Sequence, residues 1–210
     1  MKKIIAIDVG NSETTVGVGN SNEWTGYRFT TRKTITSDEL LMMFKTIIDI
    51  EPIKENKVDG AIICSVVPQI TNSVALATSK FISKDAIVVG PGIKTGLKVN
   101  IDNPKELGPD RIANSIGGYM KVKSPVIVVD LGTATTFDLV NEKKEYLGGA
   151  IAPGIKISLD ALTSKTSSLK SVELETPKSV VGKNTYEAIQ SLSLIHISEP
   201  TRPRLISYAV

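Results

Sequence analysis

The chain has 210 residues, 41% of them hydrophobic and 22% charged, so it can bury a sizeable core and has the composition of a soluble globular protein. A net charge of +3 spread along the chain is too small to indicate nucleic-acid binding. The single cysteine, Cys64, excludes an internal disulfide framework and, within an apolar run, is expected in a buried strand. The N-terminal apolar run 4–7 is too short for a signal peptide or membrane span, so we expect a cytoplasmic protein without membrane contacts.

Two stretches share one order: an apolar strand, an aspartate, one apolar residue, a glycine, a polar turn and a second strand. One surrounds Asp8 and Gly10, and the other surrounds Asp130 and Gly132. Each predicts a β-hairpin, because glycine lets the backbone approach a ligand and N–H groups in such a turn can cradle phosphate. Either one alone could be an ordinary hairpin with a polar turn. Their repetition over a long period indicates two similar halves.

Alternating and helical patterns predict the elements that follow the first hairpin. We expect a third strand over 23–31, a helix with Ser37 as its N-cap, a buried strand over 58–67, a helix over 70–81 and a strand over 86–89. The order β-β-β-α-β-α-β and the two hairpins resemble the superfamily of actin, hexokinase and Hsp70. The resemblance implies an α/β fold with two ribonuclease-H-like halves around an ATP-binding cleft: residues 1–115, and residues 116–191 as an incomplete second half.

A third informative segment starts a helix after Gly108 and Pro109, where Asp110 and Arg111 stand side by side. Opposite charges at a helix start often form a solvated cap. A carboxylate and a guanidinium at this point could equally serve as a base and an anion clamp. Both readings stay open on the residues alone.

The last native-looking segments are rich in glycine or polar caps. The glycines within 148–154 indicate backbone packed close to the cleft, and a helix is expected from Ile155. Residues 182–191 predict a loop, a polar N-cap and another helix, which could be a plain capped helix.

Five segments in this order and spacing closely resemble type III pantothenate kinase. They are residues 8–12, 108–111, 130–135, 148–154 and 182–185. The resemblance implies ATP-dependent phosphorylation of pantothenate to 4'-phosphopantothenate, the first step of coenzyme A biosynthesis. It also implies Mg²⁺ with the ATP, a monovalent cation (K⁺ or NH₄⁺), and a homodimer in the full-length form.

The family pattern also implies roles for individual residues. Asp110 would be the general base, and Asp130 would hold the monovalent cation. Thr133 would contact ATP, and the first turn would bind the ATP phosphates, with Mg²⁺ held at Asp8 through them. That turn comprises Asp8, Val9, Gly10, Asn11, Ser12, Glu13, Thr14 and Thr15. Pantothenate would be held by Gly108, Pro109, Asp110, Arg111 and Thr185.

These residue types suit phosphoryl transfer, which needs alignment and charge neutralisation more than covalent help. A carboxylate can receive the hydroxyl proton, and Arg111 can pair with the carboxylate of pantothenate. Two positions depart from the family pattern. Ser12 stands where the family usually has Thr, and Ile101 stands where many members have Tyr, so we assign no substrate contact to Ile101.

Residues 192–210 resemble translated sequencing-adaptor read-through rather than native sequence, and we exclude them from the fold. The sole histidine, His196, falls in this tail, so no catalytic role is assigned to it. Family members continue instead with a glycine-rich adenine-side segment and a dimer helix. Loss of that section would uncover apolar sheet surface, at ~25 cal/mol per Å². We therefore expect the 210-residue chain expressed as written to be unstable or inactive, and tests of activity call for the full-length gene product.

Two other functions fit parts of the sequence. One is a sugar or acetate kinase of the same superfamily, against which the segments 108–111 and 182–185 weigh. The other is a non-catalytic nucleotide-binding regulator, against which the candidate base Asp110 and the lack of a basic recognition helix weigh. A substrate panel with ATP, and DNA binding at physiological salt, would separate the three.

Overall fold

The computed structural model describes residues 3–50, 58–90, 92–166, 172–173, 175, 179 and 181–191. The chain forms two compact units, Met1–Ile127 with Asp138–Gly148, and Val128–Phe137 with Gly149–Val210. These units differ from the predicted halves 1–115 and 116–191, which stay predictions. The predicted tail, 192–210, lies outside the described residues.

The first unit opens with a five-stranded sheet in the order β3-β2-β1-β4-β5. β1 is antiparallel to β2 and parallel to β4. The predicted order β-β-β-α-β-α-β and the α/β class are therefore confirmed. The elements are β1 (Lys3–Val9), β2 (Glu13–Gly19), β3 (Trp24–Thr30), α1 (Ser37–Ile50), β4 (Val58–Ser65), α2 (Pro68–Ile82) and β5 (Ile87–Val88).

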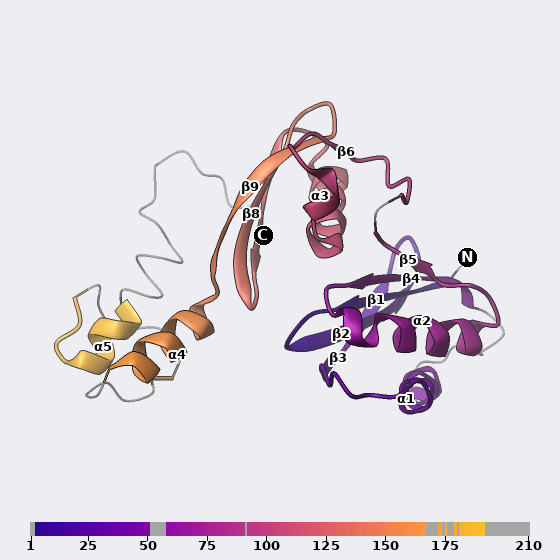
Figure 1. The fold of residues 1–210 in the computed structure, drawn as a ribbon, viewed down its shortest axis with the longest axis horizontal. Helices are drawn as coiled ribbons and strands as arrows, with labels where there is room; N and C mark the ends of the chain where they lie inside the picture. The colour runs from indigo at the N-terminus through magenta and orange to yellow at the C-terminus, as the bar shows by residue number, and fades with distance from the viewer. Residues whose placement is uncertain are drawn as a thin grey trace. The chain divides into compact units, whose positions relative to one another are not determined.

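One face of this sheet makes the first core. Because side chains alternate along a strand, Ile5, Ile7 and Val9 of β1 point to the same side and are 3% exposed or less. α1 and α2 lie on this side of the sheet (Figure 1) and bury apolar stripes against it. The cap of α1 is Thr36 rather than the predicted Ser37: its N–H donates to the Glu39 carboxylate, and Glu39 N–H donates back to Oγ1.

The second sheet has four strands in the order β6-β9-β8-β7. The second predicted hairpin is confirmed, with its turn at Gly132 and Thr133 between β7 and β8. β9 continues through the glycine pair at 148 and 149 to Pro153. The sequence did not predict a strand here, because glycines usually weaken a strand. The elements are β6 (Lys98–Val99), the 3₁₀ helix η2 (Pro104–Glu106), α3 (Pro109–Val122), β7 (Val126–Leu131), β8 (Ala134–Val140) and β9 (Glu145–Pro153).

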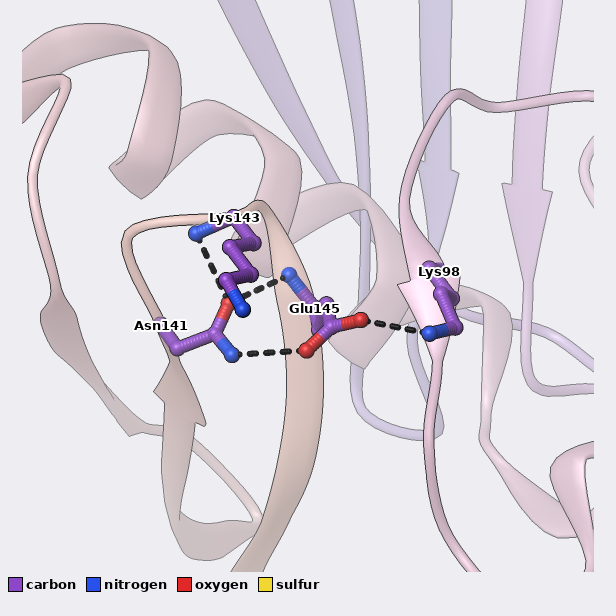
Figure 2. Close-up of polar contacts among 4 residues, drawn as sticks. All are labelled: Lys98, Asn141, Lys143 and Glu145. Carbon is purple, nitrogen blue, oxygen red and sulfur yellow. Dashed lines mark hydrogen bonds and ion pairs between the residues drawn. The ribbon is translucent and has the colours of Figure 1, made fainter.

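An asparagine side chain closes the turn between β8 and β9 (Figure 2). Asn141 Oδ1 accepts hydrogen bonds from the N–H groups of Lys143 and Glu145 at 3.0 and 2.9 Å, and its Nδ2 donates to the Glu145 carboxylate at 2.8 Å. The same carboxylate pairs with Lys98 of β6. Those hydrogen bonds, from Lys98 first and Asn141 second, lower the pKa of Glu145. The turn thus also fixes β6 beside β9.

Two helices follow, α4 (Ile155–Lys165) and α5 (Thr185–Gln190), both as predicted. Asn184 caps α5 by accepting a hydrogen bond from the Glu187 N–H at 2.8 Å. Over the part of the chain that the structure describes, every helix is too short or too polar to cross a membrane.

Candidate active site

The floor of the candidate site is the sheet face opposite the first core. The strand register places Thr15, Asp8 and Cys64 in one row across β2, β1 and β4. It places Gly17, Ala6 and Ile62 in the next row. Because residues two apart share a face, the two rows lie side by side. In the second row Gly17 has no side chain and Ala6 a small one, which leaves space above the sheet, and Asp8 of the first row supplies a carboxylate beside that space.

Helix α3 provides the opposite wall. Asp110, Ala113 and Asn114, spaced as one face of a helix, line a cavity of ≈ 290 Å³ together with Asp8 and Cys64. Two predicted site residues that are 102 positions apart in the chain, Asp8 and Asp110, therefore share one cavity. Its wall is mostly apolar with a few convergent polar groups, as ligand sites usually are.

The pKa of the Cys64 thiol is affected by both carboxylates. Burial raises the pKa of Cys64 to about 12, and the negative charges of Asp8 and Asp110 and a hydrogen bond to Asp8 act in the same direction. A neutral thiol that donates to Asp8 is a poor nucleophile. The prediction of a buried strand cysteine is confirmed, with Cys64 8% exposed.

The start of α3 places the candidate base. Gly108 is the N-cap and Pro109 the first helical residue, and the Asp110 carboxylate accepts the Arg111 N–H at 2.8 Å. A Cβ on Gly108 would lie 2.5 Å from Oδ1 of Asp110, so the carboxylate occupies the space that the missing side chain leaves. The positive end of the helix dipole also favours a carboxylate here.

Arg111 does not belong to a solvated cap, so that alternative is wrong. Its Nε donates a hydrogen bond to Oδ1 of Asp138 at 2.9 Å, its Nη2 forms an ion pair with the same oxygen at 2.7 Å, and its side chain is 16% exposed. The sequence interpretation missed Asp138, which is fully buried. A signal existed, because Thr136, Asp138 and Val140 alternate along β8, and a carboxylate at an inward position of a strand needs a partner.

Hydroxyl groups brace the first turn. Thr31, which follows β3, donates from Oγ1 to the Gly10 carbonyl at 2.7 Å and from its N–H to the Ser12 carbonyl at 2.9 Å. Since that hydroxyl hydrogen is used, the 2.8 Å contact with Thr14 Oγ1 is a bond that Thr14 donates. Gly10 N–H bonds the Glu13 carbonyl at 2.9 Å and closes the turn. The predicted phosphate-binding segment is therefore a fixed loop.

Backbone hydrogen bonds close the second turn. Gly132 N–H donates to the Ala134 carbonyl, and Gly154 N–H donates to the Thr133 carbonyl, both at 3.0 Å. A Cβ on Gly154 would lie 2.2 Å from the Gly132 carbonyl oxygen, so only glycine fits against this turn. Asp130 is the penultimate residue of β7. Gly154 thus packs closely against this turn, and the predicted position of the glycine segment beside the cleft stays a prediction.

Three predicted site residues, Asp130, Thr133 and Thr185, belong to the second unit, whereas the cavity lies in the first. Thr185 is exposed at the first position of α5. The roles of these three residues stay predictions.

Comparisons with known proteins agree on one family. The family model described as type III pantothenate kinase matches residues 4–196. Proteins named type III pantothenate kinase from Exiguobacterium sp. and Geobacillus sp. are 41% and 43% identical over 189 residues, 90% of this chain and 74% and 73% of theirs. A solved Campylobacter jejuni structure, assigned to the Baf family of transcriptional activators, matches 92% of this chain and 75% of its own with a TM-score of 0.53. At 19% identity this last likeness concerns the fold alone.

Proposed function

The chain belongs to the type III pantothenate kinase family, and from that membership we propose that it transfers the γ-phosphoryl group of ATP to the primary hydroxyl of pantothenate. The products are 4'-phosphopantothenate and ADP. This reaction is the first step of coenzyme A biosynthesis.

One structural observation supports the proposal most strongly: Asp8 and Asp110 face the same cavity from different elements. In the proposed reaction the pantothenate hydroxyl oxygen attacks the γ-phosphorus and the bond to the ADP oxygen breaks. Asp110 takes the hydroxyl proton, which a carboxylate at the wall of the cavity can reach. The braced first turn, from Asp8 to Thr15, holds the phosphates, so the two reactants are aligned by parts of one unit.

The residues present fit a magnesium ion brought by the nucleotide. Over the described ranges no group of three or more Asp, Glu, His or Cys side chains could hold a metal. Mg²⁺ typically uses one or two carboxylates together with substrate phosphates, and Asp8 is an exposed carboxylate in this cavity. When bound, the ion would neutralise charge on the phosphate oxygens.

The remaining roles complete the proposal. Asp130 holds a monovalent cation, Thr133 contacts ATP, and Thr185 contacts pantothenate. Arg111 offers the pantothenate carboxylate its guanidinium edge that faces away from Asp138. The proposal also includes a homodimer in the full-length form and a cytoplasmic location.

Product identification tests the proposed function. The purified protein is incubated with ATP, Mg²⁺ and K⁺ and with pantothenate, a sugar panel or acetate, and the products are resolved by mass spectrometry. We expect one phosphate added to pantothenate alone, dependent on ATP. Phosphorylation of a sugar or of acetate instead would identify another kinase, and DNA binding without any phosphorylation would identify a regulator.

A further inference from the structure

Three polar atoms converge on one buried oxygen next to the candidate site. Oδ1 of Asp138 accepts hydrogen bonds from Arg111 Nε at 2.9 Å and the Tyr146 hydroxyl at 2.7 Å, and it forms an ion pair with Arg111 Nη2 at 2.7 Å. Asp138 is fully buried and Tyr146 is 1% exposed. The Asp138–Arg111–Tyr146 cluster therefore ties β8, α3 and β9 together at one point.

Asp138 stabilises the charged form of Arg111 and the protonated form of Tyr146. Burial works against the guanidinium charge, but the hydrogen bonds and charge of Asp138 raise the pKa of Arg111. Burial and the bond to Asp138 raise the pKa of Tyr146 to about 12, so its hydroxyl remains a donor at neutral pH. The guanidinium carbon also lies 5.8 Å from the centre of the Tyr146 ring, within the range of a cation–π contact. Charge-assisted bonds of this kind are strong and directional.

The cluster restrains the end of α3 that carries the candidate base. Arg111 directly follows Asp110, and its backbone N–H donates to the Asp110 carboxylate. The far end of the same helix is tied separately, by the Tyr119 hydroxyl, which donates to the Glu142 carbonyl at 2.9 Å. The two ties are about two helical turns apart and can be removed independently.

We propose that Asp138 is a positioning residue: through Arg111 it sets where the first turn of α3, and with it Asp110, stands in the cavity. The inference rests on the proposed function for its kinetic consequences. Asp138 lies outside the cavity, but through Arg111 it sets the position of the proposed base Asp110 and the orientation of the guanidinium edge proposed to meet the substrate. Because the Nε and Nη2 edge is held by Asp138, the substrate carboxylate meets a guanidinium of fixed orientation.

Steady-state kinetics of Asp138→Asn and Tyr146→Phe test the proposal. Both variants weaken the cluster while keeping side-chain size. We expect kcat/KM for pantothenate to fall about tenfold to a hundredfold in Asp138→Asn and less in Tyr146→Phe, with KM for ATP unchanged, since misplacement of about 1 Å can cost that much. Tyr119→Phe is the matched control, because it removes the tie at the other end of α3; its pantothenate kinetics should match the wild type.

A double variant and a hydrogen-exchange measurement, which does not depend on turnover, distinguish a positioning role of Asp138 from a purely stabilising one. With Arg111→Lys already present, Asp138→Asn should add little, because residues that act through one another are non-additive. Hydrogen exchange of the segment 108–114 should accelerate in Asp138→Asn and not in Tyr119→Phe. Unchanged pantothenate kinetics together with wild-type exchange would overturn the inference. If the wild-type protein does not phosphorylate pantothenate, the proposed function fails, and the exchange experiment alone decides the positioning role.

Discussion

At the scale of single residues, Cys64 links the cavity to the pH dependence of stability. Its pKa is raised from 9.0 to about 12 in the folded protein, first by burial and then by Asp8 and Asp110. Between these pH values the unfolded chain has lost the thiol proton while the folded protein keeps it. The contribution of the Cys64 thiol to the free energy of unfolding is therefore fully present below pH 9 and is lost as pH rises towards 12.

We predict that the free energy of unfolding falls above pH 9, with Cys64 contributing up to about 1.4 kcal/mol per pH unit. Tyr146, whose pKa is raised to about 12, acts in the same direction. Urea unfolding at pH 8, 9 and 10 measures the slope, and Cys64→Ala should make it shallower. Equal slopes for the variant and the wild type would contradict the raised pKa of Cys64.

A second residue-scale prediction concerns Gly108. In Gly108→Ala the new methyl group would lie 2.5 Å from the Asp110 carboxylate, so the carboxylate must move. We expect kcat to fall about tenfold or more, because the proposed base, Asp110, is misplaced. The control is Gly117→Ala on the same helix, where a Cβ meets nothing within 4 Å. This change should stabilise the protein by up to about 1 kcal/mol and leave kcat unchanged. Equal activity of the two variants would remove Gly108 from this role.

At the scale of elements, the end of β3 supports the turn between β1 and β2. Thr31 donates hydrogen bonds to the Gly10 and Ser12 carbonyls and accepts one from the Thr14 hydroxyl, so its side chain and backbone together hold three residues of the loop. Thr14 is 7% exposed, so its hydroxyl depends on this partner.

We predict that Thr31→Val raises KM for ATP severalfold and lowers the free energy of unfolding by about 1–3 kcal/mol, because buried polar groups lose their partner. KM for pantothenate should not change. Thr25→Val, at an exposed position of β3, serves as the control and should alter neither quantity. A stability loss in Thr31→Val without a change in KM for ATP would show that the turn does not bind the nucleotide.

The elements themselves were largely predictable because their patterns are local. The alternation of β1 and the apolar stripe of α1 follow directly from burial on one side. The cap at Thr36 and the strand through Gly148 were missed. A cap depends on which oxygen reaches which N–H, and glycines have low strand propensity that pairing with neighbours can override.

At the scale of the whole molecule, the sequence led to Asp8 and Asp110 through a family resemblance, and the fold places them in one cavity. The alternation of β8 indicates an inward-facing Asp138, but its partners could not be predicted, because α3 and β9 are brought beside it only by the packed sheet. The same limit applies to Thr31 and Cys64, whose partners lie on other segments of the chain. Long-range pairing of polar side chains is set by tertiary structure rather than by spacing.

Family membership and the shared cavity together make Asp110 the residue on which the account depends. Its substitution by Asn keeps the size of the side chain and removes its ability to accept a proton at neutral pH. The turn between β1 and β2, proposed to bind the nucleotide, lies on other elements of the same unit and should be unaffected.

The most direct measurement is therefore turnover and ATP binding of Asp110→Asn beside the wild type. Transfer of labelled γ-phosphate to pantothenate and calorimetric titration with Mg·ATP are carried out on the same preparations. We predict that turnover falls by at least about 10²-fold while Kd for ATP stays within about twofold. Near-normal turnover of Asp110→Asn would contradict the role of Asp110 as the base.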